Sequence, residues 1–311
     1  MRVASKRFLA DLLNAPGPSG YEGPVRRVWK AEVERYADRV EVDVHGNAFA
    51  VYNGQGSPRI MFAGHMDELG FQVIYIDEKG YLYFDTIGGF DLHLVPGRKV
   101  RIHTANGSIL GVLGKKPIHL MAAGDRRKVP DKHDLWIDIG VADRAEAEKL
   151  VAIGDPVTYE ANYEELRNGL AVSRGFDNKA GAWVVAEVLR RVSSAKKKCR
   201  ASIYSVATVQ EEIGLRGART SAYGIDPLVG IAAAMRSRGH DVSLLANEAY
   251  SGLAQEAGIG FTEVGKQSQL ENTKRHPLAW TYADGWKVWT RDAGVAPMRE
   301  LYRAIERLHV P

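Results

Sequence analysis

The sequence predicts an α/β protein with three parts: a split α/β/α domain, a small β-barrel inserted into it, and a C-terminal Rossmann-like α/β fragment. Helix and strand patterns come first, and short β-type runs interrupt them after about residue 67. From about residue 231, helix and strand patterns alternate again. A chain of 311 residues has room for such compact units.

The first elements have the periodicities of helices and then of strands. Residues 5–14 and 22–36 place apolar side chains at helical spacing, and the turn-rich sequence PGPSG separates them. Three alternating or apolar segments follow, with the sequences VEVDVHG, NAFAVYN and RIMFAGHMD. We expect the third to be a strand that ends at an acidic loop containing His65.

The predicted insertion consists of short β-type runs punctuated by Gly, Asp and Asn. These runs cover residues 71–76, 81–85, 98–104, 108–113 and 135–139. Such spacing is typical of a small barrel or sandwich rather than of βαβ units. We assign residues 67–161 to the inserted β domain, and residues 1–66 and 162–230 to the split domain.

The second half of the split domain contains a helix and a strand with acidic residues beside them. Residues 178–192 carry a helical pattern with one apolar face, and the strand pattern ASIYSVATV runs into Gln210 and the two glutamates after it. In the tail, residues 231–311, the segments AAAMRSRGH and YSGLAQEAG favour helices, and DVSLLAN and IGFTEVG favour strands. We therefore expect an atypical α/β tail.

Charge and composition exclude several classes of protein. The formal net charge is +4, and the densest basic run, at 196–200, lies between a helix and a strand pattern, where a solvated turn is favoured over a nucleic-acid-binding patch. The single cysteine, Cys199, permits no internal disulfide. No run of about eighteen apolar residues and no signal-peptide pattern is found. We expect a cytoplasmic protein that binds neither nucleic acid nor membrane.

Three junctions between predicted elements carry residues suited to metal chemistry. His65 and Asp67 follow a strand, and a carboxylate can hold the second ring N–H of a metal-binding histidine. Asp177 precedes a helix, where a simple N-cap is the alternative. Glu211 and Glu212 follow a strand, and neighbouring carboxylates repel each other unless a cation lies between them. Solvated loops are the alternative for the first and third junctions.

Taken together, the three junctions predict more than each does alone. One imidazole and several carboxylates at strand ends are the donors of a divalent metal site with nitrogen and oxygen ligands. An additional glutamate beside a ligand is suited to act as general base toward an activated water. With one cysteine in the chain, a thiolate site is excluded.

At these residues the chain resembles the tetrahedral aminopeptidases of clan MH, the glutamyl and deblocking aminopeptidases. The resemblance covers about residues 5–230. It is carried by PSGYE at 18–22, GHMDELGF at 64–71, GKKPIHL at 114–120, LWIDIG at 135–140, AVSRGFDNKAG at 171–181 and VQEEIGLRGA at 209–218. The number and order of these motifs make the resemblance specific.

The resemblance implies a site with two divalent metal ions, zinc or cobalt, with manganese as a further option. His65 would bind one metal, Glu212 would bind the other, and Asp177 would bridge both. Glu211 would be the base that deprotonates the bridging water, and Asp67 would orient His65. The implied reaction is removal of an N-terminal residue from a peptide substrate.

The resemblance also implies a peptidase-type α/β/α catalytic domain and a homo-oligomer that the inserted β domain helps to assemble. The family has two further ligands, an Asp after the strand near 229–231 and a His near the C-terminus. Here the first region reads GIAAAMRS, and the second motif is absent. We therefore expect weak binding of the second metal and impaired catalysis.

Residues of about 226–311 resemble a different class, the N-terminal half of GT-B glycosyltransferases, in which a helix ending in RGH leads into a strand. We interpret the chain as a join of two sequences inside IDPLVGIA, and a divergent natural tail is the alternative. The predicted function is that of a metal-dependent aminopeptidase. A non-catalytic metal- or peptide-binding relative is one alternative, and a glycosyltransferase fragment is another.

Overall fold

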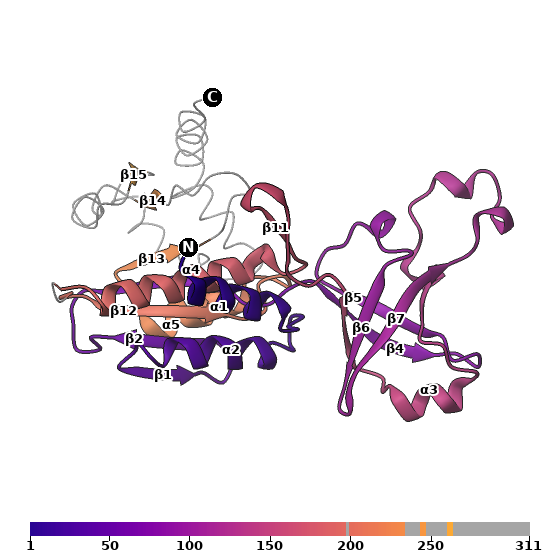
Figure 1. Cartoon of the computed structure of the whole chain (residues 1–311), viewed down its shortest axis with the longest axis horizontal. Coiled ribbons are helices and arrows are strands. Elements are labelled where there is room, and N and C mark those ends of the chain that lie inside the picture. The colour runs from indigo at the N-terminus through magenta and orange to yellow at the C-terminus, as the bar shows by residue number, and fades with distance from the viewer. Residues whose placement is uncertain (197–198, 234–242, 247–259, 264–311) are drawn as a thin grey trace, which may run out of the picture. The chain divides into compact units, whose positions relative to one another are not determined.

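The computed structural model describes residues 1–196, 199–233, 243–246 and 260–263, and the chain divides into two compact units, residues 1–235 and 236–311 (Figure 1). The helices of the first unit are α1 (Val3–Asn14), α2 (Gly23–Val33), α3 (Arg144–Leu150), α4 (Phe176–Ser193) and α5 (Arg216–Ile225). Its strands are β1 (Arg39–Val42), β2 (Ala48–Tyr52), β3 (Arg59–His65), β4 (Gly70–Ile76), β5 (Leu82–Ile87), β6 (Lys99–Thr104), β7 (Gly107–Lys115), β8 (Leu135–Asp138), β9 (Pro156–Tyr159), β10 (Glu164–Glu165), β11 (Ala171–Val172), β12 (Ser202–Thr208) and β13 (Val229–Ala232).

The central sheet of the first unit has the strand order β1-β2-β12-β3-β13. Strand β12 pairs in parallel with β3 and antiparallel with β2, and β13 continues the parallel part on the other side of β3. Every residue of β12 is buried, as expected for a strand covered on both faces. The parallel part of the sheet therefore lies in the interior of the α/β domain.

Helices cover both faces of this sheet (Figure 1). Helices α1, α2 and α4 bury Leu12, Trp29 and Leu189 in one core with side chains of β2 and β12. On the opposite face, Ile225 at the end of α5 packs into a second core that includes Tyr204. The α/β/α layering predicted from the sequence is present in this unit.

Helix α4 packs closely on β3 beside the predicted site. A Cβ on Gly64 of β3 would collide with the backbone of Gly181 and Ala182 in α4, so glycine is required at position 64 for this approach. The predicted apolar face of the helix is buried, including Val185 and Leu189. The first turn of α4 is thereby held against the end of β3.

The inserted segment forms a closed barrel with the strand order β4-β5-β8-β7-β6-β9, which confirms the predicted small barrel. Its interior is apolar and includes Phe71, Phe84, Leu113 and Ile137, each almost fully buried. Helix α3 contributes Ala147 to the same core. The barrel is thus a separate hydrophobic core within the first unit.

Several elements of the first unit were not predicted from the sequence. Helix α3 is short, α5 contains two glycines that weaken a helical pattern, and β10 and β11 pair as a hairpin of two-residue strands. Short 3-10 helices also occur at Leu92–Leu94, Ile118–Leu120, Asp125–Arg127, Lys132–Asp134 and Arg167–Gly169. None of the helices in the described part of the chain is long and apolar enough to cross a bilayer.

The second unit is described at two strands, β14 (Ser243–Ala246) and β15 (Gly260–Glu263), which pair in parallel. They lie within the segments DVSLLAN and IGFTEVG, which were predicted as strands. The helix predicted at AAAMRSRGH is wrong at its start, because Ala232 ends strand β13 of the first unit. The rest of the helices predicted for the tail lies outside the described residues, as do Lys197 and Lys198 of the basic run. The Rossmann-like fragment therefore stays a prediction.

Candidate metal centre

Parallel pairing brings two of the three predicted junctions to one edge of the central sheet. His65 is the last residue of β3, and it pairs in register with Thr208, the last residue of β12. The ladder continues for one more bond, in which the Met66 backbone N–H donates to the Thr208 carbonyl at 2.8 Å. The loops that follow both strands therefore leave the sheet side by side, at the carboxyl edge where α/β proteins commonly place their chemistry.

The imidazole of His65 lies between carboxylates on both of its nitrogen atoms. Nε2 is 3.2 Å from Asp177 Oδ1 and 3.6 Å from Glu211 Oε2. Nδ1 is 3.3 Å from Asp67 Oδ1 and 3.1 Å from the Asp67 carbonyl oxygen. The residue is 7% exposed, so it is not the solvated loop histidine that the sequence left open. Its Nε2 side faces Asp177, a predicted ligand, and Glu211, the predicted base.

Asp67 is fully buried behind His65 and accepts hydrogen bonds from three other groups. The Ser19 hydroxyl donates to Oδ2 at 2.6 Å. The backbone N–H groups of Glu211 and Glu212 donate to its two oxygens at 3.1 and 3.2 Å. Asp67 therefore connects the loop after β3 to the loop after β12, in addition to facing His65.

Asp177 does not cap helix α4, although an N-cap was the simplest interpretation of its position. Its backbone is extended, and the Asn178 side chain instead accepts the Gly181 N–H at 2.9 Å in the manner of a cap. The Asp177 side chain is 89% exposed, and its Oδ1 lies 3.2 Å from Nε2 of His65. It is free of a structural role in the helix and open to a ligand.

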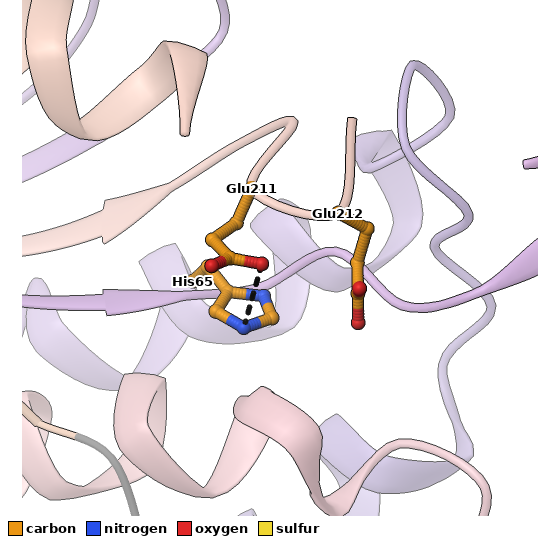
Figure 2. Close-up of side chains that lie close together, drawn as sticks. All are labelled: His65, Glu211 and Glu212. Atoms are coloured by element: carbon orange, nitrogen blue, oxygen red, sulfur yellow. Dashed lines mark ion pairs between the residues drawn. The ribbon is translucent and has the colours of Figure 1, made fainter. Parts of the chain in front are cut away.

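Glu211 and Glu212 extend from the loop after β12 toward the side where His65 lies (Figure 2). In the described part of the chain, His65, Glu211 and Glu212 form one group whose potential ligand atoms all lie within 4.8 Å of one another. The Glu211 side chain is 34% exposed. The structure therefore brings all five predicted site residues together.

The ionisation of this group reflects its crowded negative charge. Burial alone would lower the pKa of His65, but the hydrogen bond and charge of Asp67 outweigh it and raise that pKa. Burial opposes ionisation of Asp67, yet the bonds from His65 and Ser19 hold its pKa below the ordinary value. Burial, with repulsion from Glu211 and Asp177, raises the pKa of Glu212 to about 7. Without a metal, protons would partly neutralise the cluster.

These residues fit a divalent metal ion. When Nδ1 of His65 carries its proton toward Asp67, the lone pair of Nε2 points at the carboxylates of Asp177 and Glu211. A lone pair and carboxylates at this separation repel each other unless a proton or a cation lies between them. Imidazole nitrogen with carboxylate oxygen is the donor set of zinc and of similar divalent metals.

A profile of the M42 glutamyl aminopeptidase family matches residues 46–255, which include all five of these residues. The chain belongs to this family. The M42 match extends beyond residue 230, where we expected the resemblance to stop, and covers part of the segment predicted to resemble a glycosyltransferase. The resemblance of residues 226–311 to that class stays a prediction.

Relatives of this M42 chain include named aminopeptidases and peptidases of known structure. It is 35% identical to the lysyl aminopeptidase of Pyrococcus furiosus over 228 residues, which are 72% of this chain and 64% of the relative. A TET aminopeptidase of a marine sediment archaeon of the Thaumarchaeota superposes with a TM-score of 0.76 and 32% identity, over 84% of this chain and 81% of that one. The M42 chain thus has a TET aminopeptidase-like fold.

A third relative is the TET1 peptidase of Pyrococcus horikoshii, which can assemble into a tetrahedron or a large octahedral shell. It superposes with a TM-score of 0.68 and 30% identity, over 84% of this chain and 85% of that one. This M42 chain spans 61–64% of the length of the first curated relatives that it matches.

The sequence analysis of this M42 chain missed several buried polar residues around the site. Ser19, Glu22, Glu68 and Lys179 are each less than 9% exposed and surround the three junctions. They were present in the quoted motifs, but no role was assigned to them. Serine, glutamate and lysine side chains are ordinarily solvated, so the positions of these residues in the sequence gave no signal of burial.

Proposed function

We propose that this chain is a metal-dependent aminopeptidase that hydrolyses N-terminal residues from peptides. The observation that carries the proposal is the meeting of His65 Nε2 with the carboxylates of Asp177 and Glu211 at the carboxyl edge of β3 and β12. The names of the family and of the Pyrococcus furiosus relative support the reaction class. Fold likeness alone would not, since one fold serves many chemistries.

His65, Asp177 and Glu212 are the proposed metal ligands, with Asp177 shared between two ions. Zinc or cobalt suits one imidazole and several carboxylates, and manganese is a further option. When bound, such ions act as Lewis acids that polarise the scissile carbonyl and make water more acidic. The buried Asp67 keeps the proton of His65 on Nδ1 and so leaves Nε2 free to act as a ligand.

Glu211 is the proposed general base. Its carboxylate stands beside Nε2 of His65 at 3.6 Å and remains open to solvent on one side, where a substrate can enter. In the proposed reaction it takes a proton from the water that attacks the scissile carbonyl. It then gives that proton to the amine that leaves, so the carboxylate is regenerated.

The sequence around residue 231 supports reduced hydrolytic activity. It reads GIAAAMRS, without the acidic residue that the family resemblance leads us to expect there. Loss of a ligand weakens one of the two proposed metal sites more than the other. A metal-binding relative without catalysis is therefore the second candidate function.

A homo-oligomer is the proposed state of the protein in solution. The Pyrococcus horikoshii relative assembles into closed shells, and this chain shares its fold with a TM-score of 0.68. In the proposal, the six-stranded barrel contributes to contacts between copies. Gel filtration with light scattering measures the mass, and a monomer at all concentrations would contradict this part of the proposal.

Metal analysis and peptidase assays on the same preparations test the proposal. We expect the wild-type chain to retain zinc or cobalt after gel filtration and to release aromatic amine from aminoacyl anilides. Asp177→Asn should lose both properties, while Asp125→Asn on the barrel surface, the same change at an exposed residue, should keep both. Metal retention without hydrolysis would favour the second candidate. Loss of both in the wild-type chain would contradict the proposal.

A further inference from the structure

The segment from residue 15 to residue 22, called the brace below, contributes no proposed metal ligand. It nevertheless forms hydrogen bonds with all three junctions that carry the ligands. These junctions are the loop after β3, the start of α4 and the loop after β12. The brace lies between α1 and α2 and includes the motif PSGYE.

The brace is joined to the loop after β3 at several points. The Gly17 backbone N–H donates to Glu68 Oε1 at 2.9 Å, and the Glu68 backbone N–H donates to the Gly17 carbonyl at 3.0 Å. Pro18 and Glu68 form a parallel bridge. Next to this bridge, the Ser19 hydroxyl donates to Asp67 Oδ2 at 2.6 Å. The carboxylate behind His65 is therefore held directly by the brace.

The start of α4 is joined to the brace by a buried lysine. Lys179, two residues after Asp177, donates to the Ala15 carbonyl and to Glu68 Oε1, each at 2.7 Å. Lys179 is 0% and Glu68 is 1% exposed. Arg174 is a second cation beside Glu68, with 3.1 Å between Nε and Oε2 and without hydrogen-bond geometry. The brace thus gives a backbone carbonyl and a backbone N–H to a buried ion cluster formed by Glu68, Lys179 and Arg174.

The loop after β12 is joined to the brace by Glu22. Its Oε1 accepts the backbone N–H of Gln210 at 3.2 Å and that of Gly20 at 2.8 Å. Gln210 has a positive φ of 54° and directly precedes Glu211. Glu22 is only 5% exposed, so its carboxylate is held in the interior by these two N–H groups rather than by water.

We propose that the brace positions the metal ligands, with Ser19 and Glu22 as its positioning residues. This inference rests on the proposed metal site. Each junction leaves a different element, and the brace connects all three through short contacts of buried groups. Such outer partners orient ligands before the metal binds, and their loss typically lowers metal affinity by about 10–100-fold. Groups that only stabilise the fold would not alter the metal environment.

The chain offers a matched pair of serines for the test. Ser19 and Ser5 are both buried and both donate to a carboxylate, Ser19 to Asp67 at 2.6 Å and Ser5 to Glu187 at 2.8 Å. Ser5 contacts none of the three junctions through its hydroxyl. Each variant therefore removes one hydrogen bond from a serine to a carboxylate. Ser19→Ala removes it beside the proposed metal site, and Ser5→Ala removes it away from that site.

The experiment measures zinc affinity by competition with a chromophoric chelator, the visible spectrum of the cobalt form, and thermal unfolding of the metal-free protein. We expect Ser19→Ala to lose about 10–100-fold in zinc affinity and to change the cobalt spectrum, with unfolding close to that of Ser5→Ala. Ser5→Ala should keep the wild-type affinity and spectrum. Equal metal affinity and equal spectra in both variants would overturn the inference.

A second pair keeps the test decisive if one serine variant is unstable. Glu22→Gln retains an oxygen that can accept the Gln210 N–H, whereas Glu22→Ala does not. We expect weak zinc binding in Glu22→Ala and rescue in Glu22→Gln. Wild-type affinity in Glu22→Ala would overturn the inference while leaving the proposed metal site intact. A wild-type chain that binds no zinc would instead overturn the proposed function, and this inference with it.

Discussion

Two histidines, one at the edge of the central sheet and one in the barrel, have pKa values shifted in opposite directions, although burial lowers the pKa of both. The barrel histidine, His103, has its Nε2 2.9 Å from the Thr158 hydroxyl. Burial, with repulsion from Arg174, lowers its pKa to about 4. At the sheet edge, carboxylates on both sides of His65 overcome burial and raise its pKa. The surroundings of His103 therefore favour its neutral form, whereas the carboxylates around His65 favour a positive charge there.

The buried polar residues of the first unit show the same contrast. Among residues 70–159, which span the barrel strands, Thr158 is the one polar residue that is buried in the described structure. The α/β part buries several carboxylates and a lysine around His65. Burying charge is costly unless it is paired, so a stable barrel avoids it. A metal ion would offset that cost at the sheet edge, which is why we assign function there.

The largest expected effect concerns the proposed base. Glu211→Gln removes the group that would carry the proton, so we expect the hydrolysis rate to fall by about 10²–10⁴-fold while zinc remains bound. Glu78→Gln makes the same change on the barrel, where the exposed Glu78 pairs with Arg144, and should leave the rate unchanged. Assays with aminoacyl anilides measure both. Equal rates for Glu211→Gln and the wild-type chain would remove Glu211 from the mechanism.

A core substitution in the barrel should affect stability without affecting the metal. Ile137 is fully buried in the barrel core, and truncation to alanine leaves a cavity that we expect to cost about 2–5 kcal/mol of unfolding free energy. Urea unfolding measures the loss, and chelator competition measures zinc affinity. A drop in zinc affinity in folded Ile137→Ala protein would show that the two regions are less independent than their cores indicate.

The two histidines provide a direct comparison of the regions. His65→Gln removes a proposed ligand, and we expect zinc affinity to fall by about 100-fold or more, beyond the usual effect of an outer partner. His103→Gln can keep a bond to Thr158 and should bind zinc as the wild-type chain does. Isothermal titration with zinc measures both variants. Similar affinities in the two variants would place the metal elsewhere.

The smallest expected effect is a pH dependence that belongs to the barrel. Because the folded pKa of His103 is about 4 and its unfolded pKa is about 6.5, the unfolded chain binds the extra proton first as pH falls. The contribution of His103 should therefore lower the free energy of unfolding as pH falls from 6.5 to 4, and this loss should be complete below pH 4. Expressed as free energy of unfolding, the whole pKa difference of His103 corresponds to about 3 kcal/mol. Partial solvent access reduces this to roughly 1–2 kcal/mol.

Metal-free wild-type and His103→Gln proteins, unfolded in urea across this pH range, measure that contribution. The unfolding free energy of the wild-type protein relative to that of His103→Gln should be constant above pH 6.5 and should fall as pH decreases toward 4. His65 should act in the opposite direction in the metal-free chain, because its raised pKa adds stability below pH 6.5 that is lost as pH rises through the folded pKa. Parallel pH curves for the two proteins would contradict the His103 assignment.

The amino-acid sequence alone was enough for five of the six barrel strands, β9 (Pro156–Tyr159) being missed, for helices α1, α2 and α4, and for the meeting of five site residues. Strand alternation and helical spacing are local properties, and parallel strands place their carboxyl ends at one edge. His65 and Glu211 could therefore be predicted as neighbours although 146 residues separate them. The metal roles assigned to them stay a proposal.

Only the tertiary structure decided which polar residues support that site. Ser19 meets Asp67 across 48 residues, Lys179 meets Glu68 across 111, and Glu22 meets Gln210 across 188. No periodicity links such positions, and each residue type is usually solvated. Their burial follows from how α4, the barrel connections and the brace pack together, which is a property of the whole fold rather than of any local pattern.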